Sequence, residues 1–205
     1  DYIVKIEDIQ VQGKTLSEAV DLMRGPIGSN IELTIRRRGE KKAIKFNITR
    51  EIIKIQSVKT ELFENDIGYI ALTRFSRGAA REVESALKFL LIDEAKGLIL
   101  DLRNNPGGLL QEAVNIVNLF VPKNQLVVST QSNIKKYNTR FVTKQQPLSL
   151  DIPLIVLVNE RSASASEIVA GALQDLDRAV VIGKQSFGKG LVQQPKPLPY
   201  GAQIK

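Results

Sequence analysis

Two short apolar runs in the second half of the chain constrain its fold more than any other feature. Residues 97–102 (GLILDL) and 152–158 (IPLIVLV) are almost continuously apolar, and each is followed by a sharp loop and a helical pattern. Strands that are apolar on both faces are typical of parallel sheets covered by helices. The sequence therefore predicts an α/β core with substantial parallel pairing.

Further strand and helix signals alternate around these two runs. We predict additional strands at 67–72 and 179–182, extended segments at 125–130 and 140–143, and helices at 79–91 and 164–176. A third helix follows the loop at 104–108 and turns Ala113, Val114 and Val117 inward. No internal repeat interrupts this alternation, so we expect one core from this part of the chain.

The first part of the chain has the pattern of a small β domain with one helix. Residues 2–6 form a short strand, and Thr15 with Glu18 has the spacing of a capping box at a helix start. Apolar residues then alternate with polar ones at 31–35 and at 44–48, which predicts two half-buried strands joined by a hairpin. A polar and β-branched connector at 50–59 leads into the larger block.

The net charge of +7 raises the question of nucleic acid, but its distribution argues against that partner. The densest basic cluster, Arg36–Arg38 with Lys41 and Lys42, lies between two predicted strands and has no interleaved aromatic residues. A solvated hairpin tip explains this cluster better than a phosphate-binding patch does. No apolar run approaches the roughly 20 residues that a membrane-spanning helix needs, so we expect no integral membrane span.

The 205 residues include no histidine and no cysteine. These absences exclude a serine-histidine-aspartate triad, a thiol nucleophile, and zinc ligands of either type, although a metal site built from carboxylates alone stays open. A serine run at 162–166 (SASAS) follows a predicted buried strand and opens a helix, where free backbone N–H groups could stabilise an oxyanion. Taken alone, these serines are explained better as helix caps than as nucleophiles.

Lys189 is the leading candidate to activate such a serine, because a neutral lysine amine can serve as a base. Residues 183–189 (GKQSFGK) also fit the first part of a phosphate-binding loop. The next residue is Gly190 instead of serine or threonine, and the prolines that follow cannot supply the required helix. The interpretation as a nucleotide hydrolase therefore fails. An exposed lysine on a glycine turn is the remaining alternative.

Three motifs occur together and in order: 101–108 (DLRNNPGG), 162–167 (SASASE) and 187–193 (FGKGLVQ). In this combination the chain resembles the carboxyl-terminal processing proteases, or tail-specific proteases, of serine peptidase family S41. The resemblance implies an α/β fold whose protease core is built of repeated ββα units, as in crotonase and ClpP, with a partial PDZ-like β domain at the N-terminus. It implies the boundaries 1–52 for the PDZ-like domain, 53–61 for the connector and 62–205 for a C-terminally incomplete core.

The resemblance also implies the roles of individual residues. Ser164 corresponds to the nucleophile, Lys189 to the general base, and Gln193 to a residue that orients the lysine amine. The backbone N–H groups of Ala165 and of either Gly107 or Gly108 correspond to the oxyanion hole. Because four residues of straight strand span about 13 Å, contact between Gln193 and Lys189 requires a bend at Gly188 or Gly190.

Two further carboxylates and an arginine were open to interpretation. Helix capping and surface charge account for Glu167 and Asp175 without a catalytic role. For Arg103 we expect an ion pair or carbonyl contact that anchors its loop.

The implied function is a serine endopeptidase that cleaves proteins near their C-termini without a cofactor or metal. Its partners would be polypeptides with exposed, apolar C-termini, recruited or sensed by the PDZ-like domain, and a homo-oligomer or a regulatory adaptor protein would be compatible with it. The family implies export to a bacterial periplasm or cell envelope. The alternative is a catalytically silent scaffold that binds proteins through its PDZ-like domain.

Overall fold

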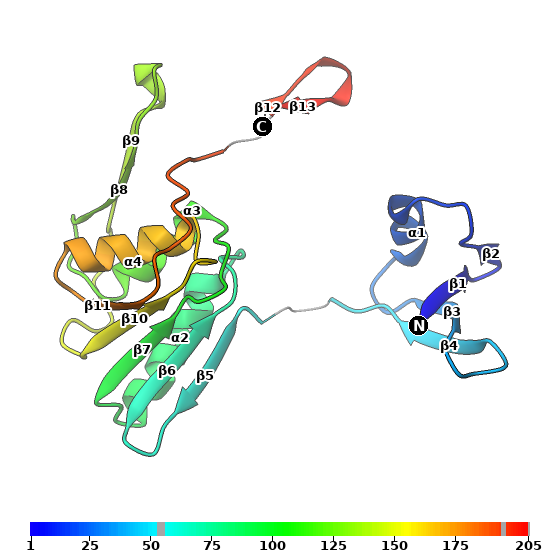
Figure 1. Ribbon diagram of the computed structural model, residues 1–205, viewed down its shortest axis with the longest axis horizontal. Helices are drawn as coiled ribbons and strands as arrows, with labels where there is room; N and C mark the ends of the chain where they lie inside the picture. The colour runs from blue at the N-terminus through cyan, green and yellow to red at the C-terminus, as the bar shows by residue number, and fades with distance from the viewer. Residues whose placement is uncertain (53–55, 194–195, 205) are drawn as a thin grey trace. The chain divides into compact units, whose positions relative to one another are not determined.

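The computed structural model describes residues 1–52, 56–193 and 196–204 of the chain. They belong to two compact units, Asp1–Ile55 and Gln56–Lys205 (Figure 1). The boundary falls within the predicted connector, of which residues 53–55 lie outside the described residues. Nowhere in the described ranges is a helix long and apolar enough to cross a membrane.

The first unit is a four-stranded antiparallel sheet with one helix. Its elements are β1 (Tyr2–Ile6), β2 (Ile9–Gln10), α1 (Leu16–Met23), β3 (Asn30–Arg36) and β4 (Ile44–Thr49), and the strand order is β2-β1-β3-β4. The predicted strands, helix and hairpin are confirmed, and the basic residues between β3 and β4 are exposed as predicted. This arrangement is consistent with a PDZ-like part.

The prediction that both hairpin strands are half-buried is wrong for β4. Phe46 and Ile48 remain 40% and 44% exposed, whereas the core of this unit is formed by Ile6, Ala19 and Ile31. The helix supplies only eight residues, and its apolar side chains cover the central strands β1 and β3. A single short helix cannot also cover the edge strand, so the outer side chains stay in water.

The second unit is a mixed α/β fold, as predicted. Its five-stranded sheet has the order β11-β10-β7-β6-β5, in which β6 (Ile67–Leu72), β7 (Gly97–Asp101), β10 (Leu154–Val158) and β11 (Val180–Gly183) are parallel. The helices α2 (Ala79–Ile92), α3 (Leu110–Asn118) and α4 (Ala165–Asp175) follow β6, β7 and β10 in the chain. The two apolar runs thus become neighbouring central strands, and their buried side chains join those of the helices in one core.

One strand of this sheet was missed by the sequence analysis. Part of the predicted connector forms β5 (Val58–Leu62), which pairs antiparallel with β6 at the edge of the sheet. Its three middle residues are exposed, so the segment carries little apolar signal of its own. Pairing with β6, which was not visible in the local pattern, makes it a strand.

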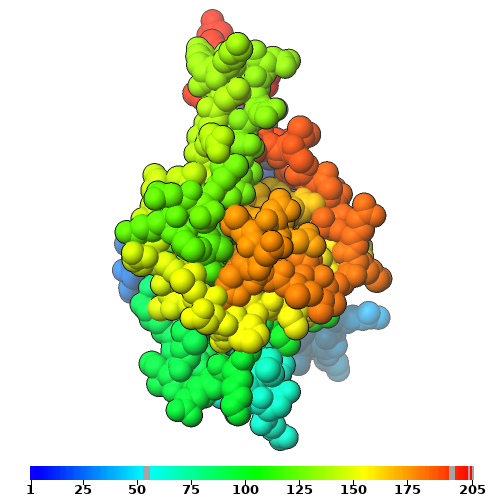
Figure 2. All heavy atoms as spheres, turned by 90° about the vertical axis from the view of Figure 1, so that its left-hand side faces the viewer, coloured from blue at the N-terminus to red at the C-terminus, as the bar shows by residue number. Residues whose placement is uncertain are grey.

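Smaller elements complete the second unit. The strands β8 (Leu126–Thr130) and β9 (Thr139–Val142) form an antiparallel hairpin that projects from the core (Figure 2). The short 3-10 helix η1 (Lys135–Tyr137) lies between these two strands in the chain. Towards the C-terminus, β12 (Lys196–Pro197) and β13 (Gln203–Ile204) pair around η2 (Pro199–Gly201).

Candidate active site

Two loops meet at the carboxyl ends of the neighbouring strands β7 and β10, which is where parallel sheets usually place their sites. The Ala163 N–H and the Ser166 hydroxyl both donate to the Asn105 carbonyl, at 3.0 and 2.9 Å. The Asn104 N–H donates to Asn159 Oδ1 at 2.9 Å. These bonds join the DLRNNPGG loop to the turn that enters α4, so the first two sequence motifs form one structural unit.

The three serines of the SASAS run have different environments. Ser162 and Ser166 are fully buried, and their hydroxyls donate to the carbonyls of Leu102, at 2.8 Å, and Asn105. Ser164 is half-buried and stands immediately before α4 with φ 58° and ψ −111°. Residues other than glycine rarely adopt such a backbone conformation. A strained residue at a strand-to-helix turn is typical of an exposed catalytic nucleophile. Ser164 alone in this run is presented in that way.

The glycine pair lies directly against this turn. A Cβ atom on Gly107 would stand 2.6 Å from the Ala163 carbonyl oxygen and 2.9 Å from Ser164 Cβ, which no side chain could occupy. The Gly107 N–H is already donated to Asn105 Oδ1 at 2.9 Å. Within the part of the chain that the structure describes, the N–H groups of Gly108 and Ala165 have no hydrogen-bond partner. Both N–H groups are therefore left without an acceptor from the described residues at this turn.

The segment carrying Lys189 returns from β11 to the same turn. Its first contacts are backbone bonds, from the Lys184 N–H to the Val158 carbonyl at 3.2 Å and from the Phe187 N–H to the Ser162 carbonyl at 3.0 Å. The chain then turns at Gly188, whose φ is 81°. The third motif thus packs beside the second, and Lys189 itself is half-buried.

Glu167, in the first turn of α4, connects this segment to Ser164. Its Oε1 accepts hydrogen bonds from the Ser186 hydroxyl at 2.8 Å and the Gly188 N–H at 2.6 Å. Its Oε2 accepts from the N–H groups of Ser164 at 2.7 Å and Lys189 at 3.0 Å. Burial raises the pKa of Glu167, but these four donors outweigh it and hold the pKa below its ordinary value.

The interpretation of Glu167 as a helix cap is confirmed, but surface charge does not describe it. Glu167 is half-buried and binds a segment about 20 residues further along the chain, which the capping pattern gave no reason to expect. The sequence offered one signal for this contact. It is the combination of an acidic third residue in the helix, Glu167, with a later glycine turn whose backbone N–H groups need acceptors. Asp175 is exposed at the far end of the same helix, as surface charge would place it.

Two of the expected side-chain contacts are not formed. Among the described residues, no hydrogen bond joins the Lys189 amine to the Ser164 hydroxyl, and none joins the Gln193 side chain to Lys189. Gln193 is exposed. The structure therefore brings the backbones of Ser164 and Lys189 together through Glu167 and leaves Gln193 apart.

Arg103 anchors its loop as expected. Its guanidinium donates to both carboxylate oxygens of Asp101, at 2.6 to 3.0 Å, and Tyr69 donates to the same carboxylate at 2.7 Å. Burial raises the pKa of Asp101, but the bonds from Arg103 and Tyr69 bring it below its ordinary value. This network fixes the start of the glycine loop at the end of β7.

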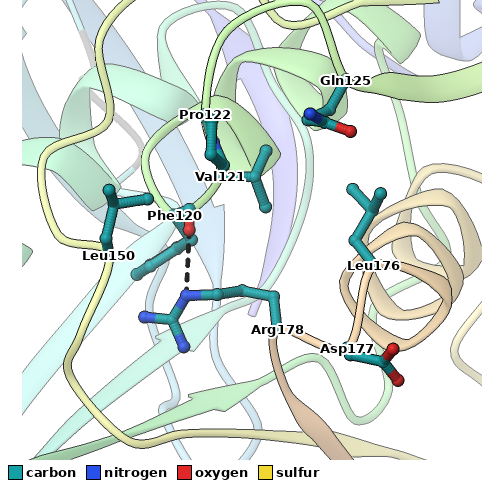
Figure 3. A pocket seen from close by; sticks show the side chains of 8 residues that line it. All are labelled: Phe120, Val121, Pro122, Gln125, Leu150, Leu176, Asp177 and Arg178. Carbon is teal, nitrogen blue, oxygen red and sulfur yellow. Dashed lines mark hydrogen bonds between the residues drawn. The ribbon is translucent and has the colours of Figure 1, made fainter.

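A cavity of about 280 Å³ lies elsewhere in the second unit (Figure 3). Phe120, Leu150 and Leu176 line it together with Arg178, which donates to the Phe120 carbonyl at 2.9 Å and to the Ile152 carbonyl at 2.8 Å. Burial lowers the pKa of Arg178. The guanidinium joins two chain segments here, and none of the predicted site residues lines the cavity.

The described residues contain no group of three or more acidic side chains that could hold a metal ion. The carboxylate-only metal site that the composition left open thus has no counterpart in the described ranges.

The matches of this chain to a protein-family model, to relatives and to solved structures agree with one another. The model of peptidase family S41 matches residues 66–205. The chain is 48% identical over 202 residues to a carboxy-terminal-processing protease of Bartonella bacilliformis, covering 97% of this chain and 46% of the relative. It is 37% identical over 205 residues to the carboxy-terminal processing protease CtpA of Bacillus subtilis, covering all of this chain and 43% of the relative.

Among solved structures, the photosystem II D1 C-terminal processing protease is similar, with a TM-score of 0.65 and 29% identity over 98% of this chain and 55% of that protein. The chain thus spans about half the length of the relatives that it matches.

Proposed function

Since the chain belongs to peptidase family S41, we propose that its protein is a serine-type carboxy-terminal processing peptidase in which Ser164 is the nucleophile and Lys189 the general base. The observation that carries this assignment is the conformation of Ser164. It is the one serine of its run that is held with a positive φ at a helix start, next to two free N–H groups, while its neighbours are buried and bonded.

The proposed reaction is an acyl transfer. The neutral amine of Lys189 takes the Ser164 hydroxyl proton as Oγ attacks the carbonyl carbon of a peptide bond. The resulting Lys189 ammonium then gives this proton to the leaving amino group as the C–N bond breaks. Water, deprotonated in the same way, hydrolyses the acyl-enzyme and restores Ser164. Gln193 would orient the amine, which requires the chain after Gly188 to bring its side chain back to Lys189.

We assign the oxyanion hole to the N–H groups of Ala165 and Gly108. Ala165 is the first residue of α4, where backbone N–H groups are free and the helix dipole favours negative charge. Of the two glycines, Gly107 already donates to Asn105, whereas Gly108 has a free N–H. Gly107 has the separate role of allowing the glycine loop to approach the Ser164 backbone closely.

The proposed substrates are polypeptides with exposed, apolar C-termini, which the PDZ-like unit would recruit or sense. We further propose that the protein acts in the bacterial periplasm or cell envelope, as a homo-oligomer or with a regulatory adaptor protein. The names of the relatives support processing at C-termini.

The test is cleavage of a peptide with an apolar C-terminus by the whole protein and by the variants Ser164→Ala and Lys189→Ala. Two matched controls are Ser162→Ala, which removes a buried hydroxyl from the same run, and Lys184→Ala, which removes an exposed lysine from the same segment. Both site variants should lose turnover, while both controls should keep it once folded. Wild-type turnover in either site variant would contradict the mechanism, and an inert wild type with an unreactive Ser164 would favour the silent scaffold.

A further inference from the structure

The carboxylate of Glu167 has an unusually complete set of hydrogen bonds. Its two oxygens accept from four donors in two segments, namely the Ser164 N–H at the helix start and the Ser186 hydroxyl, Gly188 N–H and Lys189 N–H in the returning segment. A single oxygen, Oε2, bonds the backbones of both Ser164 and Lys189. The distance between these two backbones is therefore set by one atom of a third residue.

The returning segment depends on Glu167 for its position. Up to Phe187 it is held by backbone bonds to the turn after β10. From residue 188 to residue 193, the only hydrogen bonds to other parts of the described chain end on Glu167, since the Gly190 N–H bonds to the nearby Gly188 carbonyl. Leu191 and Val192 are 72% and 55% exposed, so packing contributes little there.

We propose that Glu167 is a positioning residue, whose carboxylate fixes the backbone of the general base Lys189 against the backbone of the nucleophile Ser164. This inference rests on the function proposed above. Glu167 touches neither the substrate nor the transferred proton in this role. It acts by limiting the positions from which the Lys189 amine can reach the Ser164 hydroxyl.

The chemistry of the four donors requires a carboxylate. A glutamine has one acceptor oxygen and one NH₂ group, so in either orientation its NH₂ group would face at least one backbone N–H of Ser164, Gly188 or Lys189. An aspartate is one methylene shorter and cannot reach both segments from the same helix position. A displacement of about 1 Å between reacting groups can cost roughly a hundredfold in rate, so Glu167→Gln should impair the chemical step and leave substrate binding largely intact.

A double-mutant cycle tests the proposal. The whole protein, Glu167→Gln, Lys189→Ala and the double variant are compared by the kcat and KM for a peptide substrate and by the rate at which a fluorophosphonate labels Ser164. We expect Glu167→Gln to lower kcat and the labelling rate about a hundredfold with little change in KM. Because Glu167 acts through Lys189, the double variant should label no more slowly than Lys189→Ala alone.

Two further variants control for folding. Ser186→Ala removes one donor to Glu167 without altering the helix cap, and it should slow labelling several-fold in the wild type and not at all in Lys189→Ala. Glu18→Gln changes the capping box of α1 in the other unit and should leave labelling unchanged. If Glu167→Gln does not fold, the labelling rates of Ser186→Ala in the wild type and in Lys189→Ala decide whether the positioning role holds.

The outcomes separate the two proposals. The positioning role would be overturned if Glu167→Gln labelled Ser164 at the wild-type rate. It would also be overturned if the rate losses of Glu167→Gln and Lys189→Ala multiplied in the double variant. Wild-type turnover by Lys189→Ala would overturn the proposed mechanism instead.

Discussion

Two helices of this protein begin with the same sequence pattern and use it differently. At α1, Glu18 accepts from the Thr15 N–H at 2.7 Å and the Thr15 hydroxyl at 2.8 Å, and Thr15 has an ordinary extended conformation. At α4, Glu167 accepts from the Ser164 N–H and also from three donors 19 to 22 residues further along the chain. The shared pattern marks a helix start in both cases. Only the donors from the Lys189 segment distinguish the start of α4, at the candidate site, from the simple helix cap of α1.

The surroundings of the two helix starts differ as well. The start of α1 belongs to a unit whose core cluster contains only Ile6, Ala19 and Ile31, whereas α4 lies within the large core of the second unit. A strained backbone persists only where neighbouring contacts fix it on several sides. The larger core can hold Ser164 in its positive-φ conformation, and the smaller one holds an unstrained Thr15.

The largest expected difference between the two helix starts is catalytic. Ser164→Ala should lower peptidase turnover by at least about a thousandfold, because it removes the proposed nucleophile. Thr15→Ala should leave turnover intact and cost about 1 kcal/mol of stability through the lost cap. Peptide cleavage and urea unfolding measure the two effects. Equal turnover losses in both variants would remove the distinction.

The next largest difference concerns the glycine beside each helix start. Gly107→Ala should cost about 2 to 4 kcal/mol and abolish activity, because its Cβ would meet the backbone at Ala163 and its φ is 95°. Gly13→Ala, two residues before Thr15, has a φ of 84° but no atom within 4 Å of the new Cβ. Its cost should be about 1 to 2 kcal/mol. Urea unfolding of both variants checks this, and similar costs would contradict the close packing at Gly107.

The third prediction concerns acidification at the start of α4. The folded-state pKa of Glu167 lies below the ordinary value of 4.5, so its contribution to stability is complete above that pH and is lost as the pH falls through the folded-state pKa. Glu167→Gln has no such proton-linked contribution, so its stability deficit relative to the wild type should shrink on acidification. Urea midpoints between about pH 7 and about pH 3 measure this. A deficit independent of pH would contradict the ionised form of Glu167.

The smallest difference is one of sign. Ser164→Gly should make the protein about 1 kcal/mol more stable than the wild type, although inactive, because glycine adopts a positive φ without strain. Thr15→Gly should make it slightly less stable, because the φ of −71° carries no strain to relieve. Hydrogen exchange of the α4 and α1 amides separates the two effects. Loss of protection in Ser164→Gly would mean that Ser164 is not strained.

Much of the fold could be predicted because its signals are local. The apolar runs of β7 and β10, the capping box at Thr15 and the alternating strands β3 and β4 all depend on residues within one element. The edge strand β5 was missed because its middle residues are exposed and only its pairing with β6 defines it. The exposure of Phe46 was missed because it depends on the reach of a helix in another part of the unit.

For the candidate site, the sequence predicted the type of chemistry. A chain without histidine or cysteine, with its serine run, glycine pair and glycine-flanked lysine in order, leaves a serine activated by a lysine as the leading choice. The resemblance pointed to Ser164, but only the tertiary structure showed that Ser162 and Ser166 are buried and bonded, that Gly107 and Gly108 differ in hydrogen bonding, and that Glu167 joins the Lys189 segment.

The physical reason is the range of the contacts. The hydroxyls of Ser162 and Ser166 find acceptors 60 and 61 residues earlier in the chain, and these acceptors become neighbours only when β7 and β10 pair in parallel. Residue types and their spacing are fixed by the sequence, but which donor meets which acceptor is decided where separate loops converge.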